Sequence, residues 1–176
     1  PIGSFYPAQY GGPNNSLFWM ARAANKAGYQ VDVATTTIGL TSDQIKDYKI
    51  DINTTCMRDG ISTTHFTSTF NLPSIQYYLW LLANIRKYNL VILTSYFYPM
   101  SWLTALVCIF RRIPFCVAPR GELKSVATQK NRLKKMLFHY LFLKHVYRFA
   151  KFYWITADQE VEESRRRGYA IDDEEY

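Results

Sequence analysis

The sequence of 176 residues lacks the patterns that mark several common classes of protein. Its three cysteines, Cys56, Cys108 and Cys116, form no CxxC pair, and their odd number argues against a disulfide framework. We therefore expect reduced thiols in a cytosolic setting. Residues 1–3 lack the basic and apolar character of a leader peptide. The uncharged run at 96–110 is shorter than the roughly 18–20 apolar residues of a membrane span, which favours a buried helix there.

Positive charge is in excess and is unevenly distributed. Residues 1–157 carry 18 Lys and Arg against 6 Asp and Glu, whereas residues 158–176 carry 3 against 8. A basic body attracts phosphates, nucleic acid or an anionic membrane, and charge alone does not choose among them. The chain is 48% hydrophobic and 20% charged, so we expect one folded domain with a real core.

Strand-like and helix-like segments alternate along the chain, without an internal repeat or a low-complexity tract. Short apolar or alternating runs predict strands at residues 31–36, 61–67, 90–95, 115–118 and 152–157. The longer periodic segments predict helices at residues 17–27, 72–87, 101–112, 130–150 and 158–167. Such alternation predicts an α/β fold, with a mainly parallel sheet covered by helices on both faces.

The two ends of this pattern are short. Only residues 2–5 are available for a first strand, and only residues 169–176 follow the last helix. A strand of about five or six residues would be normal. We therefore expect the domain to be truncated at both ends. Residues 38–60 have a polar, irregular composition with no regular element predicted.

A glycine pair precedes the first predicted helix. Gly11 and Gly12 stand before the capping residues 14–16, and Gly28 marks the point where the helix should stop. A helix N-terminus offers unsatisfied N–H groups and partial positive charge, so this place suits a phosphate. An ordinary turn that needs glycine for positive φ explains the same pair equally well.

A second candidate site lies in the segment "CVAPRGELKSVA", residues 116–127, at the end of a predicted buried strand. Open α/β sheets bind ligands at the carboxyl ends of their strands. Arg120 carries a permanent charge that can hold a phosphate or a carboxylate, and Gly121 permits a close backbone approach. The alternative is a structural salt bridge from Arg120 to Glu122 or to the acidic tail.

The predicted helix at 130–150 is basic. Its spacing places two leucines and three cations on one stripe, namely Lys134, Leu137, Leu141, Lys144 and Arg148. Cations interleaved with leucines suit an anionic membrane surface, although a solvated stripe on an otherwise packed helix fits as well. No signature of nucleic-acid binding accompanies the charge, so we expect no nucleic-acid partner.

Other polar and aromatic residues give weaker signals. The three histidines, His65, His139 and His145, form no cluster, and we predict no metal site. Tyr96 and Tyr98 follow a predicted buried strand and are candidates for lining a pocket, with ordinary packing as the alternative.

Three segments together resemble the retaining glycosyltransferases of family 4, which have the GT-B fold. Residues 4–35, "SFYPAQYGGPNNSLFWMARAANKAGYQVDVAT", resemble the opening strand, Gly-Gly loop and first helix of these enzymes. The segment "APRGEL" resembles their Pro-(His/Arg)-Gly signature, and "ITADQEVEESRRRGY" resembles the last strand and helix of their N-terminal domain. The resemblance covers nearly the whole chain, in the right order.

The resemblance implies that residues 1–176 form a Rossmann-like, three-layer N-terminal domain, one half of a GT-B fold. In this family the C-terminal domain binds most of the nucleotide-diphosphate sugar and carries a Glu-x₇-Glu motif, and we expect this chain to lack that domain. The whole enzyme would transfer a sugar to a glycan or lipid-linked acceptor, in bacterial surface polysaccharide synthesis. It would need no cofactor or metal and would act in the cytoplasm, at the inner face of the membrane.

The resemblance also implies roles for single residues. Gly11 and Gly12 would approach the donor diphosphate or sugar, and Arg120 stands where many members have a histidine close to the donor sugar. Tyr96, Tyr98 and Glu122 would belong to the acceptor pocket. We expect the isolated domain to be nearly inactive. The alternatives are a non-catalytic module that binds a membrane or a glycan, and a stand-alone nucleotide-binding domain.

Overall fold

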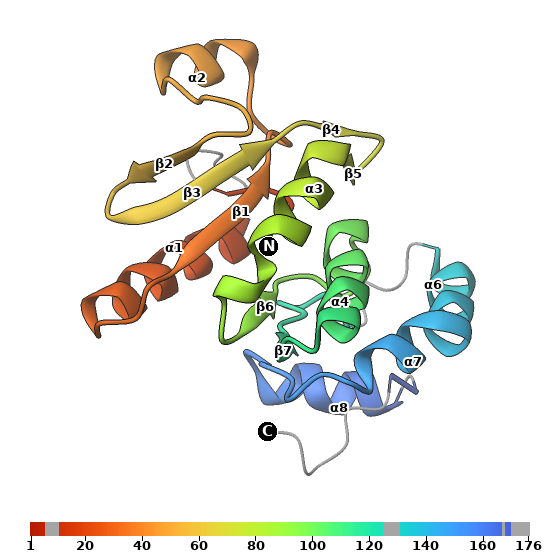
Figure 1. Cartoon of the computed structure of the whole chain (residues 1–176). Helices are drawn as coiled ribbons and strands as arrows, with labels where there is room; N and C mark the ends of the chain where they lie inside the picture. Colours follow the sequence, from red (N-terminus) through yellow and green to blue (C-terminus); the bar gives the residue numbers. More distant parts are fainter. Residues whose placement is uncertain (6–10, 125–130, 167, 170–176) are drawn as a thin grey trace. The chain divides into compact units, whose positions relative to one another are not determined.

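The computed structural model describes residues 1–5, 11–124, 131–166 and 168–169 (Figure 1). The chain divides into two compact units, Pro1–Trp80 and Leu81–Tyr176. Several stretches used in the sequence analysis lie outside the described residues. They are residues 6–10 of the opening segment, 125–127 of the second candidate segment, the first residue of the helix predicted at 130–150, the last residue of the helix predicted at 158–167, and the last seven residues of the acidic tail.

The first unit contains a sheet of three strands in the order β1-β3-β2. Strands β1 (Asp32–Thr36) and β3 (Ile61–Phe66) run parallel, and β2 (Thr55–Arg58) pairs antiparallel with β3. The expected first strand is reduced to a single parallel bridge between Ile2 and Thr35. Helix α1 packs on this sheet, and the buried residues of the cluster are Ile2, Phe5, Leu17, Ala21, Val33 and Ile61.

Helix α1 (Gly11–Lys26) begins six residues earlier than the predicted helix, so the glycine pair lies in its first turn. Pro13 is accommodated there because the first turn of a helix does not use its N–H groups. The helix ends where Gly28 predicts. The Gly28 N–H donates to the Asn25 carbonyl and the Tyr29 N–H donates to the Ala24 carbonyl, both at 3.0 Å.

The structure adds elements that the sequence pattern did not predict. Helix α2 (Ser42–Asp47) and strand β2 lie within the segment taken as irregular, and a capping box between Thr41 and Gln44 begins α2. Strands β4 (Ser68–Thr69) and β5 (Leu72–Pro73) form a short hairpin, and β5 occupies the first two residues of the helix predicted at 72–87. That helix is therefore shorter, and consists of α3 (Ile75–Asn84) followed by the 3₁₀ turn η1 (Ile85–Lys87).

The second unit contains a parallel pair, β6 (Val91–Leu93) and β7 (Phe115–Val117). Tyr153 extends the pair through a parallel bridge to Val117. The strand expected at 152–157 is therefore limited to this single bridge. The α/β class is confirmed. The described strands form three small sheets with both parallel and antiparallel pairs, so one mainly parallel sheet is not shown.

The helices of the second unit follow the predicted order. They are α4 (Pro99–Arg111), α6 (Arg132–Phe138), the π-helical stretch η2 (His139–Leu143), α7 (Lys144–Tyr147) and α8 (Asp158–Arg166). The predicted basic helix thus contains a π-helical segment in its middle. Within the described ranges, no helix combines the length and the apolar character that crossing a membrane requires.

Candidate functional site

Arg120 lies just beyond β7, at the carboxyl end of the strand, in a tight turn. The Glu122 N–H donates to the Pro119 carbonyl at 3.1 Å, and both central residues are left-handed, with φ of 56° at Arg120 and 86° at Gly121. Glycine accepts this conformation freely, whereas arginine loses roughly 1–2 kcal/mol in it. The turn therefore holds Arg120 in a backbone conformation that an isolated chain would rarely adopt.

The Arg120 guanidinium lies over the ring of Trp154, with its central carbon 5.7 Å from the ring centroid. Such a cation–π contact is favourable by about 0.5–1 kcal/mol at exposed sites. Burial lowers the pKa of Arg120, and the nearby Cys116 and Glu160 raise it. Because a guanidinium stays protonated in proteins, the strand end carries a positive charge.

Glu122 is turned toward the loop that follows β6. Its Oε1 accepts a hydrogen bond from the Ser95 hydroxyl at 2.7 Å, and its Oε2 accepts from the N–H groups of Tyr96 (2.7 Å) and Phe97 (3.1 Å). Burial raises the pKa of Glu122, while these hydrogen bonds lower it. The carboxylate thus joins the two strand-end loops of this unit. Its place in an acceptor pocket stays a prediction.

Tyr96 is buried, with 2% of its surface exposed. Its hydroxyl lies 2.9 Å from His139 Nδ1, and its carbonyl accepts a hydrogen bond from the Tyr147 hydroxyl at 2.9 Å. Tyr98 is half-buried, and its buried hydroxyl has no hydrogen-bond partner among the described residues. These contacts give Tyr96 a packing role. The place of Tyr98 in an acceptor pocket stays a prediction.

Glu160, in the first turn of α8, is a residue that sequence reasoning missed. It is fully buried, and its Oε1 accepts hydrogen bonds from the N–H groups of Gly121 at 2.7 Å and Leu123 at 3.4 Å. Burial raises the pKa of Glu160, and the nearby Lys124 and Arg120 lower it. A glutamate in a first turn is already explained by the helix dipole, so the sequence carries no signal for this contact.

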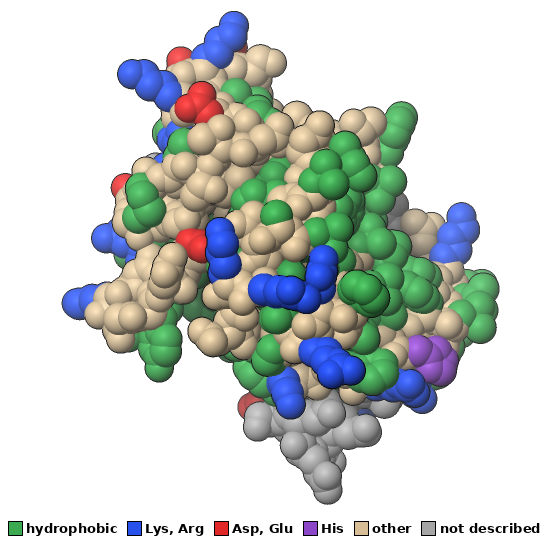
Figure 2. Space-filling view, viewed as in Figure 1, with side chains coloured by type: hydrophobic (Ala, Val, Ile, Leu, Met, Phe, Trp, Pro, Cys, Tyr) green, Lys and Arg blue, Asp and Glu red, His purple; other side chains and the backbone are tan. Residues whose placement is uncertain are grey.

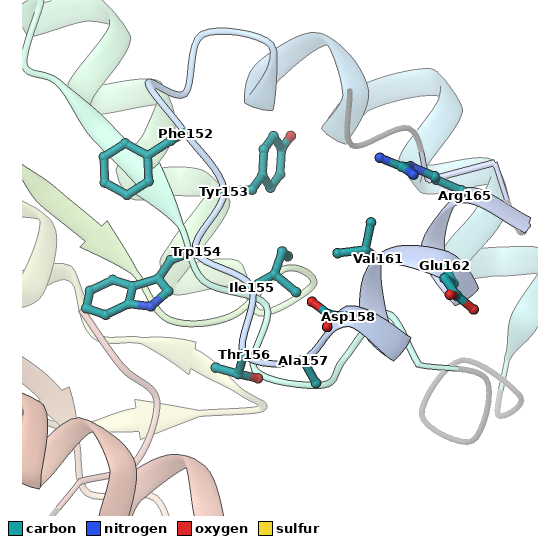
Figure 3. A pocket seen from close by; sticks show the side chains of 10 residues that line it. All are labelled: Phe152, Tyr153, Trp154, Ile155, Thr156, Ala157, Asp158, Val161, Glu162 and Arg165. Carbon is teal, nitrogen blue, oxygen red and sulfur yellow. The ribbon is translucent and has the colours of Figure 1, made fainter. Parts of the chain in front are cut away.

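An open hollow of about 920 Å³ lies between residues 152–157 and the start of α8 (Figure 3). Trp154, which Arg120 covers, is one of its lining residues. Ile155 and Val161 give it apolar walls, and the polar side chains that line it are Thr156, Asp158, Glu162 and Arg165. None of the residues predicted to form a site lines this hollow.

The glycine pair belongs to the first unit. Gly12 is exposed, a Cβ at this position would have nothing within 4 Å, and its φ is not in the left-handed region. A turn that needs positive φ therefore does not explain glycine at position 12. The first turn of α1 presents an open backbone there, and donor contact by Gly11 and Gly12 stays a prediction.

The predicted membrane stripe is exposed on consecutive turns from α6 to α7. Its leucines, Leu137 and Leu141, are 59% and 70% exposed, and its three cations are exposed as well. Leu133 lies on the same helical run and is 76% exposed. Figure 2 shows hydrophobic and cationic side chains side by side on the face in view.

The cysteines are buried or half-buried. Cys108 and Cys116 are buried, and burial raises the pKa of their thiols to about 12 and about 11, whereas Cys56 is half-buried. Within the described ranges, no three side chains of His, Cys, Asp or Glu come close enough together to hold a metal ion.

Comparison with protein families gives one match that spans most of the chain. Residues 11–175 match the family described as "Glycosyl transferase 4-like domain". No curated protein sequence matches the chain. The family match includes the glycine pair, the Arg120 turn and α8.

Proposed function

Because the chain belongs to the glycosyl transferase 4-like domain family, we propose that it is the N-terminal, acceptor-binding half of a retaining GT-B glycosyltransferase. The donor is a nucleotide-diphosphate sugar, and the acceptor is a glycan or a lipid-linked glycan of a bacterial surface polysaccharide. The second half of the cleft comes from a C-terminal nucleotide-sugar domain. The observation that carries the proposal is the cation held at the carboxyl end of β7, within a chain of this family.

We assign to Arg120 the stabilisation of negative charge on the donor diphosphate, or on a phosphorylated acceptor. A fixed guanidinium is suited to this task, because charge that develops in the transition state is best stabilised by groups that are already oriented. It is a poor proton shuttle because its pKa is too high. Gly11 and Gly12 contribute backbone N–H groups at the start of α1, where an anion is favoured.

The test is sugar transfer by the full-length enzyme carrying Arg120→Ala. We expect kcat/KM to fall about 10²- to 10³-fold, the loss typical of removing one group that stabilises transition-state charge. Arg112→Ala is a matched control, because Arg112 is exposed and has nearly the same left-handed φ, 57°. Equal activities of the two variants would contradict the role of Arg120. Absence of transfer by the unaltered enzyme would favour a non-catalytic binding module.

We also propose that the exposed stripe from α6 to α7 rests on an anionic membrane, at its cytoplasmic face. The stripe combines exposed leucines with cations on neighbouring turns, so leucines enter the interface while the charged groups stay at the lipid phosphates. A lipid-linked acceptor would then reach the enzyme in the plane of the membrane.

A further inference from the structure

The buried carboxylate of Glu160 accepts hydrogen bonds from the turn that carries Arg120. Glu160 Oε1 accepts hydrogen bonds from the N–H groups of Gly121 and Leu123, on either side of Glu122. These contacts join α8 to the turn after β7, across 39 residues of sequence for Gly121. The position of the turn therefore depends on α8.

The second oxygen of this carboxylate is not used for a hydrogen bond. Glu160 Oε2 is buried and has no hydrogen-bond partner among the described residues, although the whole side chain is removed from solvent. A buried carboxylate is costly unless a charge compensates it. The charged groups that act on Glu160 are the cations Arg120 and Lys124 of the same turn. Lys124 and Arg120 lower the pKa of Glu160 and so favour its charged form next to the turn.

We propose that Glu160 is a positioning residue, which holds the Arg120–Gly121 turn and keeps the Arg120 guanidinium in its working orientation over Trp154. This inference rests on the proposed function, because it assigns to Glu160 an effect that acts through Arg120. Glu160 itself is fully buried, so its effect is exerted through the turn that it holds.

The test is a double-mutant cycle in the full-length enzyme, with Glu160→Gln, Arg120→Ala and the double variant. Glutamine keeps an oxygen that accepts from the Gly121 N–H but removes the charge. We expect Glu160→Gln to lower kcat about 10- to 100-fold, with little change in the KM for the donor, because small misplacements of a group that orients a substrate have effects of this size. In the Arg120→Ala background the same change should have less than about a twofold effect.

The control is Glu163→Gln on the same helix, where Glu163 accepts a surface hydrogen bond from Gln159. Equal factors for Glu160→Gln with and without Arg120 would overturn the inference and leave the proposed function standing. An Arg120→Ala variant with full activity would instead contradict the proposed role of Arg120. If Glu160→Gln does not fold, Glu160→Asp keeps the charge on a shorter side chain, and full activity of that variant would also overturn the inference.

A second readout is independent of sugar transfer. The side-chain ¹⁵Nε resonance of Arg120, assigned by its loss in Arg120→Ala, should shift in Glu160→Gln and stay in place in Glu163→Gln. An unchanged Arg120 resonance in Glu160→Gln would overturn the positioning role, whatever the activity of the enzyme.

Discussion

At the scale of single residues, the second unit buries several groups whose protonation affects stability. His139 is 1% exposed, and its Nδ1 lies 2.9 Å from the Tyr96 hydroxyl. Burial, with a smaller effect of Lys144, lowers the pKa of His139 to about 4. A neutral histidine in the folded protein and a protonated one in the unfolded chain make stability depend on pH.

We predict that His139 makes the protein less stable as the pH falls. The unfolded chain takes up a proton near the usual pKa of about 6.5, and the folded protein only near pH 4, so stability is lost between these values. The loss is on the order of 3 kcal/mol. Urea unfolding from pH 7 to pH 4 should therefore show a smaller decrease in the free energy of unfolding for His139→Gln than for the parent.

Two comparisons isolate this effect. Glu122 and Glu160 have raised pKa values and favour the folded state at low pH, but they act equally in the parent and in the variant. His145→Gln, which replaces an exposed histidine of α7, is the matched control variant. If the free energy of unfolding falls equally with pH in the parent and in His139→Gln, the lowered pKa of His139 does not contribute to the pH dependence of stability.

At the scale of elements, two helices end in the same way. Gly28 follows α1 with φ of 90°, and Gly168 follows α8 with φ of 75°. After α8, the Gly168 N–H donates to the Arg165 carbonyl and the Tyr169 N–H donates to the Ser164 carbonyl, both at 3.0 Å. Both ends therefore need a residue that accepts left-handed backbone.

The surroundings of the two glycines differ, which leads to a second prediction. A Cβ at Gly28 has nothing within 4 Å, whereas a Cβ at Gly168 would lie 2.1 Å from the Tyr140 hydroxyl. We expect Gly28→Ala to lower the free energy of unfolding by about 1 kcal/mol, the backbone cost alone. Gly168→Ala should lower it further, because the Tyr140 side chain must move.

Chemical denaturation of the two variants measures the difference, and Tyr140→Phe tests its cause. Without the hydroxyl, the closest atom to the new Cβ is the ring carbon at 3.3 Å, so the additional effect of Gly168→Ala should decrease. If Gly28→Ala and Gly168→Ala lower the free energy of unfolding equally, the Tyr140 side chain moves away from the new Cβ without a cost in stability.

The π-helical stretch shows what local pattern misses within a predicted helix. The apolar and basic periodicity of residues 130–150 indicates a regular helix, yet η2 at His139–Leu143 is π-helical. His139 contacts Tyr96 across 43 residues of sequence, and no pattern within the helix itself records that contact. Spacing alone predicted that the stripe residues share one face of the helical run, and the structure shows that this face is exposed.

At the scale of the whole molecule, positive charge and exposed leucines predict binding to anionic vesicles. Leu137→Glu with Leu141→Glu should reduce binding of the full-length protein at least tenfold in co-sedimentation, because each leucine contributes roughly 1.5–3 kcal/mol when removed from water. Binding of the parent should weaken at high salt.

The control for this experiment is Leu79→Glu on α3, an exposed leucine (61%) on a helix without Lys or Arg. This variant should bind vesicles as the parent does. Two results would contradict membrane binding by the stripe: an equal loss of vesicle binding in Leu79→Glu, or unchanged vesicle binding in the Leu137→Glu, Leu141→Glu variant. Either result would leave the glycosyltransferase assignment unaffected.

The sequence by itself determined the features that depend on neighbours along the chain. The α/β class, strands such as β1 and β3, and the helix stop at Gly28 follow from periodicity, apolar runs and glycine, which act over a few residues. The family resemblance and the place of Arg120 at the end of a strand were also visible, because ordered motifs are read directly from the sequence.

Only the tertiary structure decided the lengths of the strands and the long-range contacts of the side chains. It reduced the strand expected at 152–157 to one bridge at Tyr153, since strand length depends on a partner elsewhere in the chain. It turned Glu122 toward a loop 25 to 27 residues away and placed Glu160 against Gly121, 39 residues away. Such hydrogen bonds exist only after packing has buried the carboxylates, so local sequence holds no record of them.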